Sequence, residues 1–268
     1  MLRSLGGIIG YRLEATDGEI GTVMDFYFDD GEWKVRYLAA DTGKWLPGRK
    51  VLIAPQALGP PDWQSGLLPV SLSTEEIKNS PGIASDEPVS RQKEMELADH
   101  FDWAPYWPQP ALGADVSTPA GPGFWPQPAS GSDVTTPEGA GSQVPMPGGA
   151  KSRTGGAKQD PGLRSFQEVK GYSINASDGE FGHVDDMIVD TSNQTIRYLV
   201  IDTRKWIPGR KVLIAPSWVR DVDWTERLLS VDHSRDEIES SPEYDPAEPV
   251  NRTYEEHLYD YYGRPRYW

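Results

Sequence analysis

The chain of 268 residues contains no cysteine and no run of about 18 apolar residues. Without cysteine, disulfides and thiolate metal sites are excluded. Without a long apolar run, a membrane-spanning helix is not expected. The apolar stretch at residues 5–9 is too short for a signal peptide and is interrupted by glycine. We therefore expect a cytoplasmic protein with no transmembrane segment.

Basic residues are also scarce, with 26 Lys and Arg against 41 Asp and Glu, a net charge of −15. The acidity belongs mainly to the outer parts. Residues 1–100 carry 10 basic and 16 acidic side chains, whereas residues 163–268 carry 13 and 20. An acidic surface repels phosphate backbones and attracts basic partners. No nucleic-acid partner is expected.

The sequence does contain a long internal repeat. Residues 41–55 read DTGKWLPGRKVLIAP and return 161 positions later as DTRKWIPGRKVLIAP. The same shift aligns residues 10–100 with 171–261 without a gap, and nearly half of the pairs are identical. A period of this length indicates a duplicated domain. We predict a first module at residues 5–100, a linker at 101–164 and a second module with an aromatic tail at 165–268.

The middle of the chain differs in composition from both modules. Residues 101–162 include 11 Pro and 11 Gly, which is typical of an unfolded, flexible linker. Trp-Pro-Gln-Pro occurs twice in it, at residues 107–110 and 125–128. Either the linker was lengthened by a local duplication, or this motif forms a polyproline helix that docks on a module or a partner.

Each module reads as five or six short strands separated by turn residues, which predicts a mainly β fold, a small barrel or sandwich. Asp17-Gly18 and Asp178-Gly179 are strong hairpin signals, because both residue types tolerate positive φ. Gly21 and Gly182 fall inside the following strand, where glycine indicates a bulge or a sharp bend.

Two short helical segments follow the strands of each module. Ser73 with Glu76, and Ser234 with Glu237, have the spacing of a capping box, and a proline after each segment ends the helix. A second helix is expected at residues 91–100 and 252–261. The aromatic tail after the second of these is expected to pack on the modules.

The strands resemble those of the PRC-barrel domain family in both modules. The residues that carry the resemblance are Asp-Gly-x-x-Gly-x-Val, the strand that ends in Arg-Tyr-Leu, and the Lys-Val-Leu-Ile strand. The resemblance implies a small, strongly bent β-barrel in each module, of the bacterial stand-alone type. Other family members are the cytoplasmic domain of the photosynthetic reaction centre H subunit and the C-terminal domain of a ribosome-maturation factor. Both act by docking on macromolecules, so it implies an interaction role.

The repeated loop is the first candidate functional element. It is similar to a phosphate loop only at first sight, because arginine precedes the lysine, no hydroxyl follows, and Arg204 replaces the first glycine. What remains is a cluster of Trp, Arg and Lys, residue types of which Trp and Arg are enriched at binding hot spots. Either the tryptophans cap the barrels and the basic residues pair with nearby acids, or these side chains contact the other module or a partner. The candidate interaction residues are Trp45, Arg49, Lys50, Trp206, Arg210 and Lys211.

Acidic residues and histidines offer few catalytic or metal-binding patterns. The repeated carboxylates fall at turns and strand ends, where Asp serves local hydrogen bonding. In residues 183–186, alternation places His183 and Asp185 on one face and Asp186 on the other, and the first module lacks two of these ligands. We therefore predict no catalytic residues, no metal site and no cofactor.

These observations predict a non-catalytic protein-interaction or scaffold protein that pairs its two barrels as an intramolecular pseudo-dimer. Its protein partner is not indicated by the sequence, and a homo-oligomer is compatible with it. The alternative is a small-ligand or metal-binding protein of stress response, and a hydrolase ranks last. A large apolar cleft would favour the ligand-binding alternative.

Overall fold

The computed structural model describes residues 1–43, 46, 49–84, 89–107, 162–203 and 210–268. The chain divides into two compact units. One contains Met1–Trp103, called here the first half, together with Gln159–Trp268, the second half. The other is Ala104–Lys158, which takes in most of the predicted linker and lies almost entirely outside the described residues.

The first half is built mainly from short strands, with helices near its end. In chain order its elements are β1 (Leu2–Ser4), β2 (Arg12–Ala15), β3 (Gly18–Asp29), β4 (Lys34–Asp41), β5 (Arg49–Ile53), η1 (Pro55–Ala57), β6 (Leu67–Pro69), α1 (Thr74–Asn79), β7 (Ile83–Ala84) and α2 (Arg91–Phe101).

The second half repeats this order with the helix α3 and the strand β13 as additions, and its described residues have no strand that corresponds to β7. Its elements are β8 (Leu163–Ser165), α3 (Phe166–Val169), β9 (Ser173–Ala176), β10 (Gly179–Asp190), β11 (Thr195–Asp202), β12 (Lys211–Ile214), η2 (Pro216–Trp218), β13 (Val219–Asp223), β14 (Leu228–Val231), α4 (Arg235–Glu239) and α5 (Arg252–Tyr261). The mainly β class predicted from the sequence is confirmed. In the part of the chain that the structure describes, no helix is long and apolar enough to cross a membrane.

The strands join into one sheet whose described pairings form an open path. Its order is β13-β14-β9-β10-β11-β4-β3-β2-β6, with the remaining strands attached at the sides. The strands β2 to β5 pair antiparallel in succession, and so do β9 to β12. In contrast, β6 pairs in parallel with β2, and β14 pairs in parallel with β9. The described strands therefore do not close into a ring, as the predicted barrels would require.

Bulges bend the long strands β3 and β10 at repeat-related places. In the pairing of β3 with β4, the register shifts between Val23 and Asp25, and the pairing of β10 with β11 shifts between Val184 and Asp186. A bulge re-aims the side chain beside it. Asp25 and Asp186 therefore lie directly after the bulges of their strands.

The short helices begin at the capping boxes that the sequence indicates. In α1 the Ser73 hydroxyl accepts from the backbone N–H of Glu76, and the Glu76 carboxylate accepts from the backbone N–H of Ser73. The same reciprocal pair, Ser234 and Glu237, begins α4, so both predicted capping boxes are confirmed. Buried apolar side chains from both halves form one contiguous core cluster.

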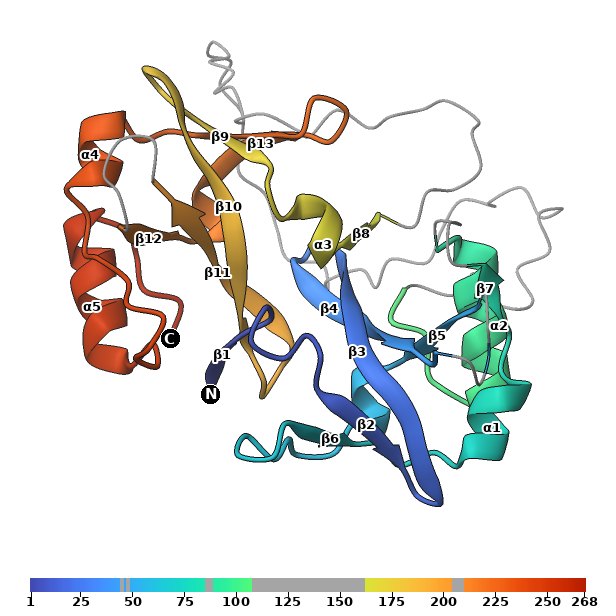
Figure 1. Ribbon diagram of the computed structural model, residues 1–268. Helices are drawn as coiled ribbons and strands as arrows, with labels where there is room; N and C mark the ends of the chain where they lie inside the picture. Colours follow the sequence, from blue (N-terminus) through green and yellow to red (C-terminus); the bar gives the residue numbers. More distant parts are fainter. Residues whose placement is uncertain (44–45, 47–48, 85–88, 108–161, 204–209) are drawn as a thin grey trace, which may run out of the picture. The chain divides into compact units, whose positions relative to one another are not determined.

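The two halves exchange their first strands. β1, at the start of the first half, pairs with β10 of the second, and β8, at the start of the second half, pairs with β3 of the first (Figure 1). A further reciprocal contact joins β4 to β11, where Val35 N–H donates to the Gln194 carbonyl and Ile196 N–H donates to the Trp33 carbonyl. Each half is thus completed by backbone hydrogen bonds from the other.

Gly21 gives a direct test of the bend in β3. Its φ is +134°, and a Cβ built on it would lie 2.0 Å from the Asp41 carbonyl oxygen. Gly21→Ala should therefore lower the free energy of unfolding by clearly more than about 1 kcal/mol, measured by urea denaturation. Gly10→Ala is the matched control, because Gly10 also has positive φ but nothing lies within 4 Å of the added Cβ. Equal losses in the two variants would contradict the proposed backbone clash.

Candidate functional site

The candidate arginines of the repeated loop contact the ends of the short helices. The Arg49 guanidinium donates to the carbonyls of Lys78, at 3.1 Å, and Ser80 at the end of α1. Arg210 donates to the carbonyl of Ser241 just beyond α4. The last carbonyls of a helix have no partner inside it, and a cation there also interacts favourably with the negative end of the helix dipole. Both arginines hold a helix end against the sheet.

The two candidate lysines differ between the halves. Lys50 donates to the Tyr27 hydroxyl at 3.1 Å, whereas Lys211 forms an ion pair of 2.6 Å with Asp185. Trp45 and Trp206 lie outside the described residues. Of the six predicted interaction residues, the structure therefore describes the two arginines and the two lysines, and the contact role of the tryptophans stays a prediction.

The predicted turn residues serve the helices as well as the hairpins. The Asp17 carboxylate accepts hydrogen bonds from the backbone N–H and hydroxyl of Thr74, the first residue of α1, at 2.7 and 2.8 Å. These bonds hold the pKa of Asp17 below its usual value. Asp178 accepts from the backbone of Arg235 in the same way. Gly18 and Gly179 begin β3 and β10, and Gly179 has a φ of +136°. At Gly182, an added Cβ would lie 2.4 Å from the Asp202 carbonyl oxygen.

One group of side chains in the second half has the geometry of a metal site. Ligand atoms of His183, Asp185 and Asp202 lie within 4.8 Å of one another. The sequence indicated that His183 and Asp185 share a face, but it missed Asp202, which β11 places opposite His183. The ammonium of Lys211 already supplies a positive charge to Asp185 and lowers the pKa of that carboxyl against the effect of burial. Lys211 therefore places a cation of the chain itself beside one carboxylate of this cluster.

The carboxylates of Asp25 and Asp186 accept hydrogen bonds from the exchanged segments. We call residues 2–9 the first arm and residues 163–170 the second arm. Asp25 accepts from the Ser165 hydroxyl at 2.5 Å and from the Gln167 N–H at 3.1 Å. Asp186 accepts from the Ser4 hydroxyl and from the Gly6 N–H at 2.8 Å. Each half thus binds the arm of the other.

Burial accompanies these bonds at Asp25, whose residue is 6% exposed. Burial raises the pKa of Asp25, because a charged carboxylate is disfavoured away from water, and the bonds from Ser165 and Gln167 oppose that rise. The sequence interpretation had assigned these carboxylates to local hydrogen bonding. A signal for the exchange was present, since Leu-Arg-Ser occurs at residues 2–4 and again at 163–165, with the same spacing of 161.

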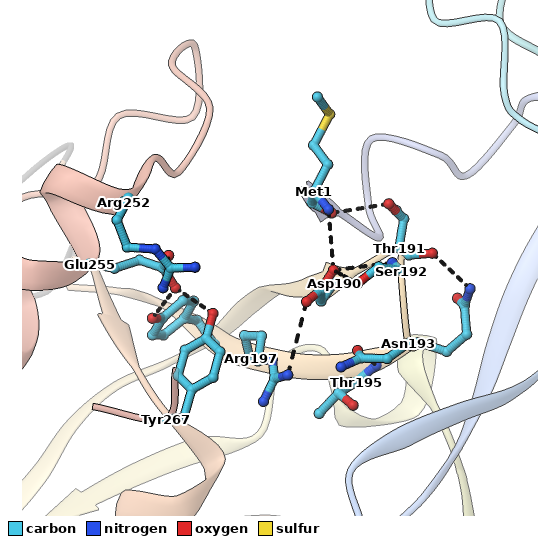
Figure 2. Close-up of polar contacts among 12 residues, drawn as sticks. Met1, Asp190, Thr191, Ser192, Asn193, Thr195, Arg197, Arg252, Glu255 and Tyr267 are labelled. Carbon is cyan, nitrogen blue, oxygen red and sulfur yellow. Dashed lines mark hydrogen bonds and ion pairs between the residues drawn. The ribbon is translucent and has the colours of Figure 1, made fainter. Parts of the chain in front are cut away.

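The aromatic tail packs on the second half around a buried carboxylate. Glu255 of α5, which is 3% exposed, accepts from the hydroxyls of Tyr198 and Tyr267, both at 2.7 Å (Figure 2). Arg252 pairs with Glu255 at 3.2 Å and lies over the ring of Trp268 at 4.0 Å. Burial and the bond to Glu255 raise the pKa of Tyr267 to about 12 and that of Tyr198 further.

Residues 8–56 match the family model of the PRC-barrel domain. The match runs from just before β2 to η1, and so includes the β2–β3 hairpin, the β3–β4 hairpin and β5. No curated protein matches the chain. The PRC-barrel match agrees with the resemblance seen in the first module.

The raised pKa of Tyr267 predicts that the free energy of unfolding decreases at alkaline pH. The pKa of Tyr267 is raised from 10 to about 12, so the folded chain retains this proton at pH values where the unfolded chain releases it. The stabilisation is complete below pH 10 and is lost as pH rises from 10 to 12. Tyr267→Phe should make this loss shallower, measured as the thermal midpoint between pH 9 and 12.

Trp63→Phe is a control for that titration, since it changes an aromatic ring of the first half without removing an ionisable group. Its midpoint should follow the same pH dependence as the parent chain. An unchanged slope in Tyr267→Phe would rule out Tyr267 as a contributor.

Proposed function

We propose that the protein is a non-catalytic interaction or scaffold protein whose two halves are a tandem of PRC-barrel modules, paired as an intramolecular pseudo-dimer. The exchange of arms carries the proposal. The contacts of the first arm with Asp186 and β10 are repeated by those of the second arm with Asp25 and β3. Repeat-related contacts across one interface are the pattern of a symmetric dimer.

The partners of the ionisable groups favour a structural use of the buried charges. Glu255 is occupied by two tyrosine hydroxyls and an arginine, and Asp25 by the second arm. A general acid or base must instead reach a proton on the substrate. These two buried carboxylates thus serve packing, which supports the scaffold role over a hydrolase.

An interaction role also agrees with the charge of the chain. Its net charge of −15 favours a basic partner surface. The tryptophans of the repeated loop, Trp45 and Trp206, are the proposed anchors. Arg49 and Arg210 instead donate hydrogen bonds to the ends of the short helices. We propose a protein as the partner, as in the docking roles that the PRC-barrel resemblance implies.

Cleavage of the linker tests the pairing of the halves. A specific protease site placed within residues 125–150 allows the full chain to be cut after folding. Because the arms bind reciprocally, the two fragments should elute together in size-exclusion chromatography at micromolar concentration. The double variant Asp25→Ala/Asp186→Ala should release them, since each change removes a pair of hydrogen bonds to the arm of the other half.

The double variant Asp17→Ala/Asp178→Ala is the matched control. It removes two carboxylates whose bonds stay within one half, so the cut fragments should remain together although each is less stable. Separation of the fragments from the parent chain after cleavage would contradict the pseudo-dimer.

Capture of partners from the native cell tests the interaction role. Trp45→Ala/Trp206→Ala should lose the captured protein and keep the melting temperature of the parent. Arg49→Ala/Arg210→Ala should keep the captured protein but lower stability by about 1–3 kcal/mol at each site, because a charged hydrogen bond to a helix end is lost. Mass spectrometry identifies the captured protein, and urea denaturation measures stability. Unchanged capture by the tryptophan variant would contradict their role as anchors.

A further inference from the structure

An apolar cavity of about 400 Å³ lies beside the sheet of the first half. Leu5, Phe26, Val35 and Leu38 of the first half line it, together with Val189 and Gln194 from the second half. Trp63, which is 37% exposed, also lines the hollow, so the hollow can be reached from solvent. It also lies within the range of small-molecule sites, about 300–1,000 Å³.

The repeat-related place, to which both halves also contribute, holds larger side chains. A shift of 161 residues relates Leu5 to Phe166, Val189 to Phe28 and Gln194 to Trp33. Phe166 and Phe28 are fully buried, and Trp33 stacks on Phe28 with ring centroids 5.3 Å apart. Three aromatic residues therefore stand at the positions related to the two aliphatic residues and the glutamine of the cavity. The cavity reflects a difference between the two copies at these positions.

A second difference opens the edge of the cavity. In the second half, β13 pairs along its length with β14. The related segment of the first half contains Gly59-Pro60-Pro61, which lines the cavity. It is held by the bridges Leu58–Val70 and Asp62–Leu67 and by the bond from the Gly59 N–H to the Pro69 carbonyl. Proline has no backbone N–H to donate to a neighbouring strand. The Gly-Pro-Pro segment therefore offers fewer backbone donors beside the cavity than β13 offers at the related place.

The lining determines the chemistry of an occupant. None of the described residues around the cavity has a charged side chain, and the N-terminal ammonium of Met1, which also lies there, is paired with Asp190 at 3.2 Å. An unpaired charge on the ligand would lose its hydration without compensation. Among the polar groups, the Gln194 side chain donates to the Thr191 carbonyl at 3.0 Å, and its amide oxygen is an acceptor for a ligand N–H or O–H. Apolar cavities as small as about 150 Å³ bind benzene.

We propose that this cavity binds one small, uncharged, mainly apolar molecule of two or three fused or linked rings. This ligand site goes beyond the scaffold role, but it rests on the proposed pairing of the halves, because both halves supply its walls. The duplication leaves one such site, because aromatic side chains of Phe28, Trp33 and Phe166 occupy the repeat-related place.

The test uses the full chain and the uncharged fluorescent probe N-phenyl-1-naphthylamine. Its fluorescence rises in apolar surroundings, so a titration should show saturable binding with one site per chain. Leu5→Phe/Gln194→Trp gives the cavity two of the aromatic residues of the repeat-related place and should weaken binding at least tenfold. Val189→Phe alone is a second filling variant, in case the double variant does not fold, as judged by circular dichroism.

The reverse exchange, Phe166→Leu/Trp33→Gln, is the matched control and should keep the affinity of the first site. Absence of saturable binding by the parent chain, or equal loss of affinity in the filled and reverse variants, would overturn the proposal. Probe binding that appears only after residues 108–158 are deleted would also overturn it, since the linker would then be the occupant. Elution of the linker-cut parent chain, measured on the same protein, separates this failure from a failure of the pairing.

Discussion

The hydrogen bonds of Asp25 and Asp186 to the exchanged arms are the constraint on which the rest of the structure depends. Each carboxylate follows a bulge in a long strand and accepts from a serine hydroxyl and a backbone N–H of the opposite arm. Burial of Asp25 is unfavourable for its charge, and these donors offset that cost. Because each arm also adds a strand to the opposite sheet, neither half has its complete set of strand pairings alone. The shared core and the walls of the cavity follow from this exchange.

Duplication within one chain gives the protein a freedom that a homodimer lacks. In a homodimer every substitution appears twice, whereas here each half can change separately. The contacts that maintain the framework are kept in both halves: the capping boxes, the bonds of Arg49 and Arg210 to the helix ends, and the glycines at the bends. Leu5, Val189 and Gln194 are among the positions that differ, and their counterparts are aromatic. The two copies therefore agree in these framework contacts and differ around the cavity.

The sequence predicts the local features of this fold well and the long-range ones poorly. Hairpins at Asp-Gly, capping boxes and the helix at residues 252–261 depend on neighbours within a few positions, and the structure contains them. The arms β1 and β8 have three residues each, too short for a periodic pattern, and their partners lie far along the chain. For the same reason the contacts of Asp25 with Ser165, and of Asp202 with the His183 group, could not be found from spacing. Trp45 and Trp206 remain sequence-based predictions.

The order of the strands has a consequence for synthesis on the ribosome. β1 emerges before the strand with which it pairs, β10, which ends at Asp190. The outer edge of β3 likewise has no partner until β8 has been made. A nascent chain in which β8 and β10 have not yet been made therefore presents an unpaired strand edge and an arm without its acceptor, which are features that promote association with other chains. The acidic character of the first 100 residues, six more acidic than basic side chains (16 against 10), opposes such association during that interval through mutual repulsion.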